Sequence, residues 1–424
     1  MKKGLISSMT MLTALALFTF SFTSCLKDNC DREVTYINPV PVYKTISEIR
    51  QPVNTETAQE MVNPGKIYKY GSYLLINEIN EGIHVVNNTD PSNPINERFI
   101  RIVGNKDIAV KNDVLYADNY IDLLAIDITN PNDAQVMNRV ENAFPNHGIS
   151  STEGVLVEYD GQEVTEKVAC DWQPRGGMFV TFDSANEVAF AGAGTGGVSG
   201  RGANLTGVAG SMARFTIMND ALYTVDDQNL NVFDISQASN PDKVNVVNLG
   251  MGIETIYPSE QYLFIGANNG MHIYDATDAN NPAYVSNFWH ATACDPVVVE
   301  GDLAYVTLRT GSECEGWINQ LQVINIANIT NPTFERSFEM TNPRGLSIDN
   351  GTLYLCDGDA GLKIFDVQNA PNLNQVSAVS DGITYDVIAS QTDDLLMVIG
   401  EDGLYQYDKS NPNELRLLSK MTVK

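Results

Sequence analysis

Basic residues and histidines are scarce in this chain of 424 residues. Lys and Arg number 26 against 53 Asp and Glu, which gives a net charge of −27, and the chain has 4 His. Such a surface repels the phosphate backbone of nucleic acids, so we expect no nucleic-acid partner. It also disfavours electrostatic binding to anionic membranes. The few histidines leave few candidates for general bases or zinc ligands.

Helical patterns are nearly missing as well. Outside the N-terminal segment, no long stretch repeats apolar residues with the 3.6-residue period of a helix. Charged residues make up 19% of the chain and hydrophobic residues 43%, so it is not a disordered polyelectrolyte. The composition therefore indicates a large all-β protein with a sizeable core.

The N-terminal segment has the features of an export signal. Lys2 and Lys3 precede an apolar run, Met9 to Phe20, which is too short for a membrane span and fits a signal-peptide core. The small residues before Cys25 resemble a lipobox, in which the chain is cleaved and Cys25 is lipidated. An ordinary secretory signal is the alternative. We expect residues 1–24 to be removed and the mature protein to be anchored in the outer membrane, on the cell surface.

The next segment, residues 25–62, lacks a clear period and predicts a tether followed by a lead-in strand at about Tyr43 to Ile49. An exported protein can form disulfides, and Cys294 with Cys314 is the candidate pair because the two residues flank an insertion. Cys356 lies in a strand-like run, which predicts a buried free thiol.

One pattern recurs along the chain. An apolar strand, a Gly/Asn/Asp turn, a second strand that closes on Asp or Asn, and a Pro-containing turn repeat about every 41 residues, with two insertions. The period predicts a β-propeller of seven blades, each of about four antiparallel strands, over residues 63–424, with Glu414 to Val423 in the last blade. The closing positions are Asn87, Asp127, Asp234, Asp275, Asn325, Asp366 and Asp408.

The closing Asp could suggest a metal site. Asn replaces it in two copies, and Asn keeps the side-chain oxygen while it loses the charge. We therefore interpret this residue as a turn-forming residue. The Asp357 to Gly361 segment, which looks like a fragment of a calcium loop, aligns with turns in other copies and is interpreted in the same way. No metal and no cofactor is expected.

Residues such as Leu230-Asn231-Val232-Phe233-Asp234-Ile235-Ser236, followed by Asn240-Pro241, resemble the LVIVD-repeat lipoproteins of the Bacteroidetes type. The resemblance covers the chain from about Lys66. It implies a surface-attached β-propeller and specifies no chemistry, because a fold alone does not fix a function.

Function is expected where the copies differ. The strand that opens each copy carries a charged residue at the equivalent position in six of seven copies, and in the sixth copy, which has Gly345 there, Arg344 lies one residue earlier. These positions would form a ring at the mouth of a central channel. The near balance of charge in this ring favours mutual ion pairs, and the alternative is a mouth that binds a polar ligand or a cation. The ring comprises Lys66, Asp107, Arg214, Glu254, Asp295, Arg344 and Asp386.

The other departures are insertions. The longest is residues 146–210, in which Val155 to Tyr159 and Glu163 to Val168 predict a hairpin that turns at Asp160-Gly161. Its Gly192 to Gly197 match to G-x-G-x-x-G is discounted because no helix signal follows. All three Trp lie in departures from the repeat, and exposed aromatics commonly anchor sugars or proteins. The candidate binding residues are Trp172, Arg175, Trp289, His290 and Trp317.

Two functions follow from this reasoning. The first is a monomeric, lipid-anchored binding or assembly module for a glycan or protein partner, without catalysis. The alternative is a propeller hydrolase or lyase that uses carboxylates at the channel mouth, which would need two carboxyl groups of different pKa in an open pocket, free of Arg partners.

Overall fold

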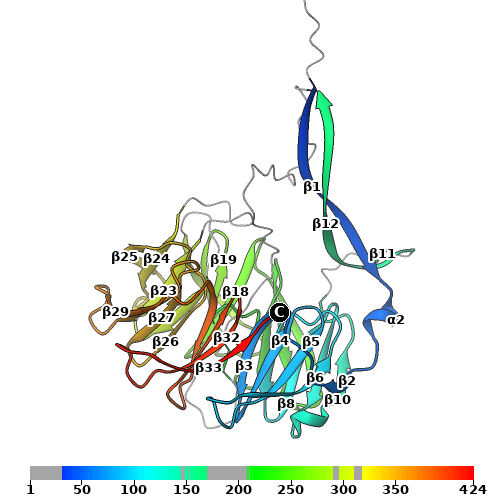
Figure 1. Ribbon diagram of the computed structural model, residues 1–424, viewed down its shortest axis with the longest axis horizontal. Coiled ribbons are helices and arrows are strands. Elements are labelled where there is room, and N and C mark those ends of the chain that lie inside the picture. Colours follow the sequence, from blue (N-terminus) through cyan, green and yellow to red (C-terminus); the bar gives the residue numbers. More distant parts are fainter. Residues whose placement is uncertain are drawn as a thin grey trace, which may run out of the picture. The chain divides into compact units, whose positions relative to one another are not determined.

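Nearly all regular structure in the protein is β. The structure, a computed structural model, describes residues 31–144, 149–150, 152–169, 208–209, 211–289, 296–309 and 318–424. Within this part of the chain, seven antiparallel sheets share one order, in which four successive strands pair with their neighbours (Figure 1). The innermost strands are β3 (Pro64–Tyr70), β7 (Ile108–Lys111), β14 (Phe215–Met218), β18 (Ile253–Ser259), β22 (Val297–Glu300), β26 (Leu346–Asp349) and β30 (Thr384–Ala389).

The two middle strands of each sheet are buried on both faces, which explains why they are continuous apolar runs in the sequence. In the third sheet, Leu222 pairs with Phe233 and Tyr223 with Val232, and all four side chains are buried. The second strands are β4 (Tyr73–Glu78), β8 (Val114–Asn119), β15 (Ala221–Val225), β19 (Tyr262–Ala267), β23 (Leu303–Leu308), β27 (Thr352–Cys356) and β31 (Leu395–Gly400). The third strands are β5 (Gly82–Asn87), β9 (Asp122–Asp127), β16 (Asn229–Asp234), β20 (Gly270–Asp275), β24 (Gln320–Asn325), β28 (Leu362–Asp366) and β32 (Gly403–Asp408).

The outermost strands face solvent on one side, and β17 accordingly alternates exposed and half-buried residues. The first sheet has two further strands: β13 (Val208–Ala209) pairs with β3, and β2 (Asn54–Thr57) pairs with β6. The outermost strands are β6 (Ile95–Arg101), β10 (Gln135–Val140), β17 (Asp242–Asn248), β21 (Ala283–Trp289), β25 (Thr333–Glu339), β29 (Asn374–Val379) and β33 (Arg416–Thr422). The expected place of the final strand in the last sheet is therefore confirmed.

The core lies between successive sheets, as a β-propeller requires, and the fold class is confirmed. The ring closes without exchange of strands, because Ile67, Leu74 and Ile76 of the first sheet pack against Met397 and Ile399 of the last. The same two sheets lie beside each other in Figure 1, in blue and red. This hydrophobic cluster buries one face of the first sheet and one face of the last, which would otherwise be exposed to solvent.

A repeated hydrogen bond joins neighbouring blades at their outer edge. Each outermost strand carries a β-bulge, and in every one except β6 the residue after the bulge bonds to the turn between the third and outermost strands of the next blade. The Ser286 and Ser377 hydroxyls donate to Ile329 O and Pro412 O, each at 2.6 Å. Ser419 of the last blade donates to Pro91 O of the first at 2.6 Å, so the same contact also closes the ring.

The closing Asp or Asn of each copy forms the turn that the sequence predicts. Its Oδ1 accepts the amide N–H of the residue two positions later, at 2.8–3.1 Å, in all seven copies. The hydroxyl and amide of Ser410, with Arg416, lower the pKa of Asp408 to about 2. The interpretation of these residues as turn formers is confirmed.

Replacing Asp234 with Ala should lower the free energy of unfolding by about 0.5–1 kcal/mol, because the bond to the Ser236 amide is lost at a solvent-accessible turn. Asp234→Asn keeps the accepting oxygen and should change the stability by less than about 0.5 kcal/mol. Urea denaturation measures both. If Asn were as costly as Ala, the charge itself would matter, and the turn interpretation would be wrong.

A long two-stranded ribbon precedes and interrupts the repeats. β1 (Asp31–Lys44) pairs with β12 (Gly154–Ala169), which also pairs with β11 (Ile149–Ser150). Within the ribbon, Thr35 and Thr165 share a hydroxyl hydrogen bond of 2.9 Å, and the Tyr36 hydroxyl donates to Glu166 at 3.1 Å. Among the described residues, no helix is long and apolar enough to cross a membrane.

Two local predictions in this region are wrong. The expected strand from Tyr43 to Ile49 is the end of β1 followed by a short helix, α2 (Ile46–Ile49), because Thr45 and Glu48 form a capping box. The expected hairpin at Asp160-Gly161 is one continuous strand. A two-residue turn needs positive φ, which neither residue has, and pairing with β1 bonds more of the backbone.

Candidate functional site

The three main insertions in the repeat begin and end at one face of the propeller. Strands alternate in direction within a blade, so the second-to-third connections and the outermost-to-next-blade connections lie at the same face. The connections β10–β14 and β21–β22 are of the latter kind, and β23–β24 is of the former. We call this the insertion face. The tight turns closed by Asp or Asn lie at the opposite face.

The innermost strands begin at the insertion face, and the described members of the predicted ring lie there. Lys66 and Asp386 lie within β3 and β30, and Arg214 immediately precedes β14. Asp107 and Arg344 precede β7 and β26, and Glu254 is in β18. Asp295 lies outside the described residues.

The axis of the propeller is occupied by the chain itself. β13 lies along the inner edge of β3, and Ser211 to Ala213 continue from it toward β14. Ser211 and Ala213 are 2% and 1% exposed. The Ser211 hydroxyl accepts Leu346 N–H at 2.7 Å, and Ala213 O accepts Ile256 N–H at 2.7 Å. We call Val208–Ala209 with Ser211–Ala213 the axial segment.

Two ring residues hold the end of the axial segment. Lys66 Nζ donates to Met212 O at 3.1 Å. Asp107 Oδ2 accepts the amides of Arg214 and Phe215, each at 2.8 Å, and its Oδ1 accepts Ile108 N–H at 2.7 Å. Both carboxylate oxygens of Asp107 are thus used by backbone groups, which is a structural arrangement.

The described part of the ring differs from the arrangements that the sequence suggests. Among the described residues, Asp107 and Asp386 make no ion pair within 4 Å of the Lys66, Arg214 or Arg344 nitrogens, and Arg214 is 3.6 Å from Asp227, outside the ring. The axial segment lies across the place where the sequence predicts a channel mouth. The sequence could not indicate this, since the segment comes from a Gly-rich insertion.

Burial shifts the pKa values of three ring residues. It lowers the pKa of Lys66 to about 7, although Asp107 and Asp386 oppose the shift. It raises the pKa values of Asp107 and Asp386 to about 7, and Lys66 again opposes the shift. Asp386 Oδ1 accepts Val387 N–H at 2.9 Å, and its side chain lies so close to Gly345 that a Cβ there would be 2.0 Å from Oδ1.

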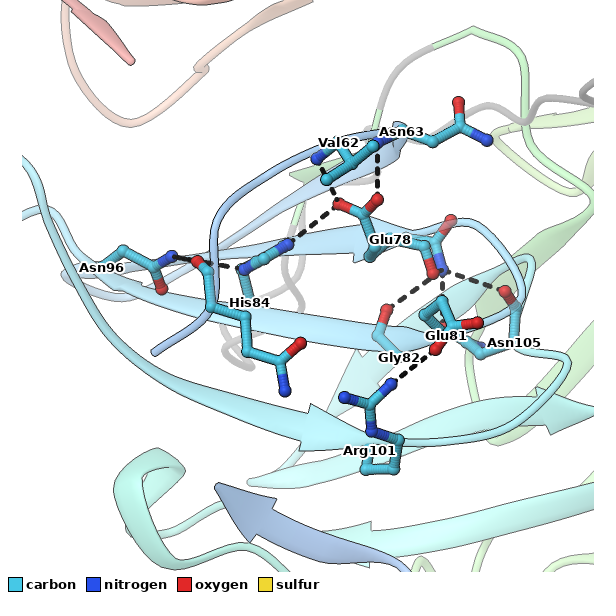
Figure 2. Close-up of polar contacts among 11 residues, drawn as sticks. Val62, Asn63, Glu78, Glu81, Gly82, His84, Asn96, Arg101 and Asn105 are labelled. Atoms are coloured by element: carbon cyan, nitrogen blue, oxygen red, sulfur yellow. Dashed lines mark hydrogen bonds and ion pairs between the residues drawn. The ribbon is translucent and has the colours of Figure 1, made fainter. Parts of the chain in front are cut away.

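A buried polar network in the first blade was not predicted from the sequence (Figure 2). His84, which is fully buried, lies 3.0 Å from Glu78 through Nε2 and 3.2 Å from the Asn96 amide nitrogen through Nδ1. Glu78 also accepts the amides of Val62 and Asn63 at 3.2 and 2.5 Å. Burial raises the Glu78 pKa, but these hydrogen bonds outweigh it and lower the pKa overall.

This network binds the lead-in chain to the first blade and leaves no reactive group exposed. A signal existed in the sequence: the position three residues before the closing Asp or Asn is His84, Asn231 and Lys363 in different copies, where an apolar residue would be expected. Asn231 and Lys363 likewise contact carboxylates at the preceding turn, Asp226 at 3.2 Å and Asp357 at 2.5 Å. Asp357 also accepts the Thr341 and Asn342 amides, so it holds the connection from β25 to β26.

Of the loop candidates, the structure describes Trp289. It is the last residue of β21, on the insertion face, and is 61% exposed. Its ring meets His272 edge-on at 5.8 Å. Trp172, Arg175, His290 and Trp317 lie outside the described residues, as do Cys25, Cys294 and Cys314.

Cys356 is a free thiol that is fully buried, as predicted. Burial raises its pKa well above the ordinary value, which keeps the thiol protonated and unreactive. In the described part of the chain, no group of three or more His, Cys, Asp and Glu side chains is arranged to hold a metal ion.

No family model and no curated protein matches this chain. Solved structures do. The periplasmic gluconolactonase of Pseudomonas aeruginosa aligns with a TM-score of 0.54 at 12% identity, over 88% of this chain and 96% of that one. A protein from Lactobacillus plantarum aligns with a TM-score of 0.54 at 13% identity, over 88% and 97%. Identities this low show the fold alone, and the chain is a β-propeller of the kind these neighbours have.

Proposed function

We propose that this protein is a non-catalytic binding module: a propeller anchored to the outer membrane through lipidated Cys25, which presents its insertion face to a glycan or protein partner. The observation that supports it most is the topology. Three departures of unrelated length and sequence all leave the repeat at one face, while the opposite face keeps the same short turn in every copy. Propeller loops that differ from blade to blade are where a fold of this kind acquires specificity.

Two further features support a binding role. Trp289 exposes a large aromatic surface on the insertion face, and such residues contribute strongly to recognition. The net charge of −27 favours uncharged or cationic partners over anionic ones. The resemblance to LVIVD-repeat lipoproteins and the lipobox agree with a surface location.

The alternative, a hydrolase or lyase, has two features in its favour. Asp386 is half-buried with a raised pKa, as a general acid would be, and one solved neighbour is a gluconolactonase. A two-carboxylate mechanism needs a second free group, however, and both oxygens of Asp107 are bound to backbone amides. We therefore favour binding.

The proposal is tested with the full chain, purified in detergent, on a glycan array and in pull-downs from the cell surface. Trp289→Ala should weaken the binding of the main partner about tenfold or more, because an exposed aromatic anchor is lost. Trp172→Ala and Trp317→Ala test the other two connections in the same way.

The matched control is Tyr284→Ala, which removes an aromatic residue that is 56% exposed, similar to Trp289. Tyr284 is the second residue of the same strand and lies at its opposite end, near the face with the tight turns. It should leave binding unchanged. Unaltered binding in all three Trp variants would contradict the proposal. So would turnover of a sugar lactone that Asp386→Asn abolishes, which would establish the alternative.

A further inference from the structure

A cavity that no function described above uses lies between the first and second blades. It has a volume of about 200 Å³ and lies where β2 extends the first blade outward, between the beginning of β2 and the ends of β6 and β8. These strand ends belong to the insertion face. Its lining includes Gln51, Val53, Asn54, Glu56, Arg101 and Asn119.

The lead-in chain builds this cavity. The seven four-strand sets repeat around the ring, but among the described residues β2 is an addition to the first blade alone, where Asn54 pairs with Arg101. The stretch Gln51 to Val53 joins α2 to β2 and forms one wall. The propeller repeat alone would therefore not produce this cavity, because one wall comes from a segment that does not repeat.

Charge on the walls is already compensated. The Arg101 guanidinium donates to Glu81 at 2.5 Å and to Glu56 at 3.3 Å, and it lies over the Phe99 ring at 4.8 Å. A charged ligand would have to displace one of these partners, or be desolvated without a new counter-charge. The cavity therefore favours an uncharged ligand.

Hydrogen-bonding capacity remains on the other walls. Asn119 is fixed, because its amide donates to Val103 O and its oxygen accepts Arg139 Nη1 at 2.5 Å. Gln51 is exposed, and no described group lies within hydrogen-bond distance of its amide. Asn54 donates to Pro52 O at 3.1 Å, which leaves its carbonyl oxygen available. A side-chain amide carries an N–H donor next to a carbonyl acceptor, and this pair can bond to neighbouring hydroxyls of a sugar. Val53 and the buried Ile102 also line the cavity and can pack against the C–H groups of the sugar.

We propose that this cavity binds one neutral monosaccharide unit, with Gln51 and Asn54 as its hydrogen-bonding partners. The volume is smaller than that of a typical drug-sized site, about 300 Å³ or more, and suits a single sugar ring. This proposal rests on the proposed function, since it names a place and a chemical class for the glycan.

The test uses the full chain in detergent and saturation-transfer NMR with neutral probes, namely glucose, galactose, mannose and N-acetylglucosamine, and charged probes, namely glucuronate and glucosamine. At least one neutral sugar should bind, and the charged sugars should bind more weakly. Gln51→Ala and Asn54→Ala should each weaken that binding about fivefold, as expected for one lost hydrogen bond. Both residues are exposed and lie outside the core, so circular dichroism should show an unchanged fold.

Gln375→Ala is the matched control, because Gln375 is an exposed glutamine on β29 far along the chain from the cavity. It should bind the neutral sugar as the wild type does. The cavity proposal is overturned if no neutral sugar binds, if charged sugars bind better, or if the two pocket variants bind as the wild type does. If the pocket variants bind an array glycan normally while Trp289→Ala loses it, the cavity proposal is wrong and the binding function stands.

Discussion

Replacing Asp107 with Ala should lower the free energy of unfolding by about 3–5 kcal/mol, because three amide donors lose their acceptor and each costs about 1–3 kcal/mol when it is buried. The change leaves the amides of Ile108, Arg214 and Phe215 without acceptors in a buried site, and each orphaned donor is costly. It also removes a negative charge that favours the charged form of buried Lys66. Urea denaturation followed by circular dichroism measures the loss.

Two variants give the controls. Asp107→Asn retains one accepting oxygen and should lose clearly less stability than Asp107→Ala. Asp366→Ala removes an Asp of the same size from an exposed turn, where it bonds a single amide, and should have a small effect. If Asp107→Ala were as mild as Asp366→Ala, the axial segment would not be held as the hydrogen bonds indicate.

Stability should pass through a minimum near neutral pH, which is the reverse of the usual behaviour of soluble proteins. Asp107 and Asp386 have pKa values raised to about 7, so the folded state binds more protons than the unfolded state between about pH 4 and 7. Their contribution is present at low pH and is lost as the pH rises to 7. The pKa of Lys66 is lowered to about 7, so its contribution is present above about pH 10 and is lost as the pH falls to 7.

The charged groups that act on Lys66 are Asp107, Asp386, Arg214 and Asp118. Urea midpoints measured from pH 4 to pH 10 test the minimum. Asp386→Asn should flatten the acidic limb, and Lys66→Met should flatten the alkaline limb. Stability that rises steadily from pH 4 to pH 7, and does so equally in Asp386→Asn, would show that these groups are not buried as described.

Sequence reasoning identified the features that repeat. The propeller, the Asp and Asn turns and the buried Cys356 each depend on contacts between residues close in sequence or on a pattern present in every copy. It misplaced features that occur once. The Asp160-Gly161 pair has turn-forming composition, yet its strand continues because β1 offers a long partner. His84 and Glu78 are six residues apart, but their contact also involves Asn96 and the lead-in chain, which no local pattern specifies.

The charged ring shows the division most clearly. The amino-acid sequence by itself determined that charged residues stand at the start of the innermost strands, because a fixed period places them in equivalent positions of equivalent blades. The tertiary structure alone decided what those charges face. The axial segment contacts Lys66, Ile256 and Leu346, which belong to three different blades. The carbonyl of Met212 and the amide of Arg214, each more than a hundred residues away in the sequence, bond to the charged groups of Lys66 and Asp107.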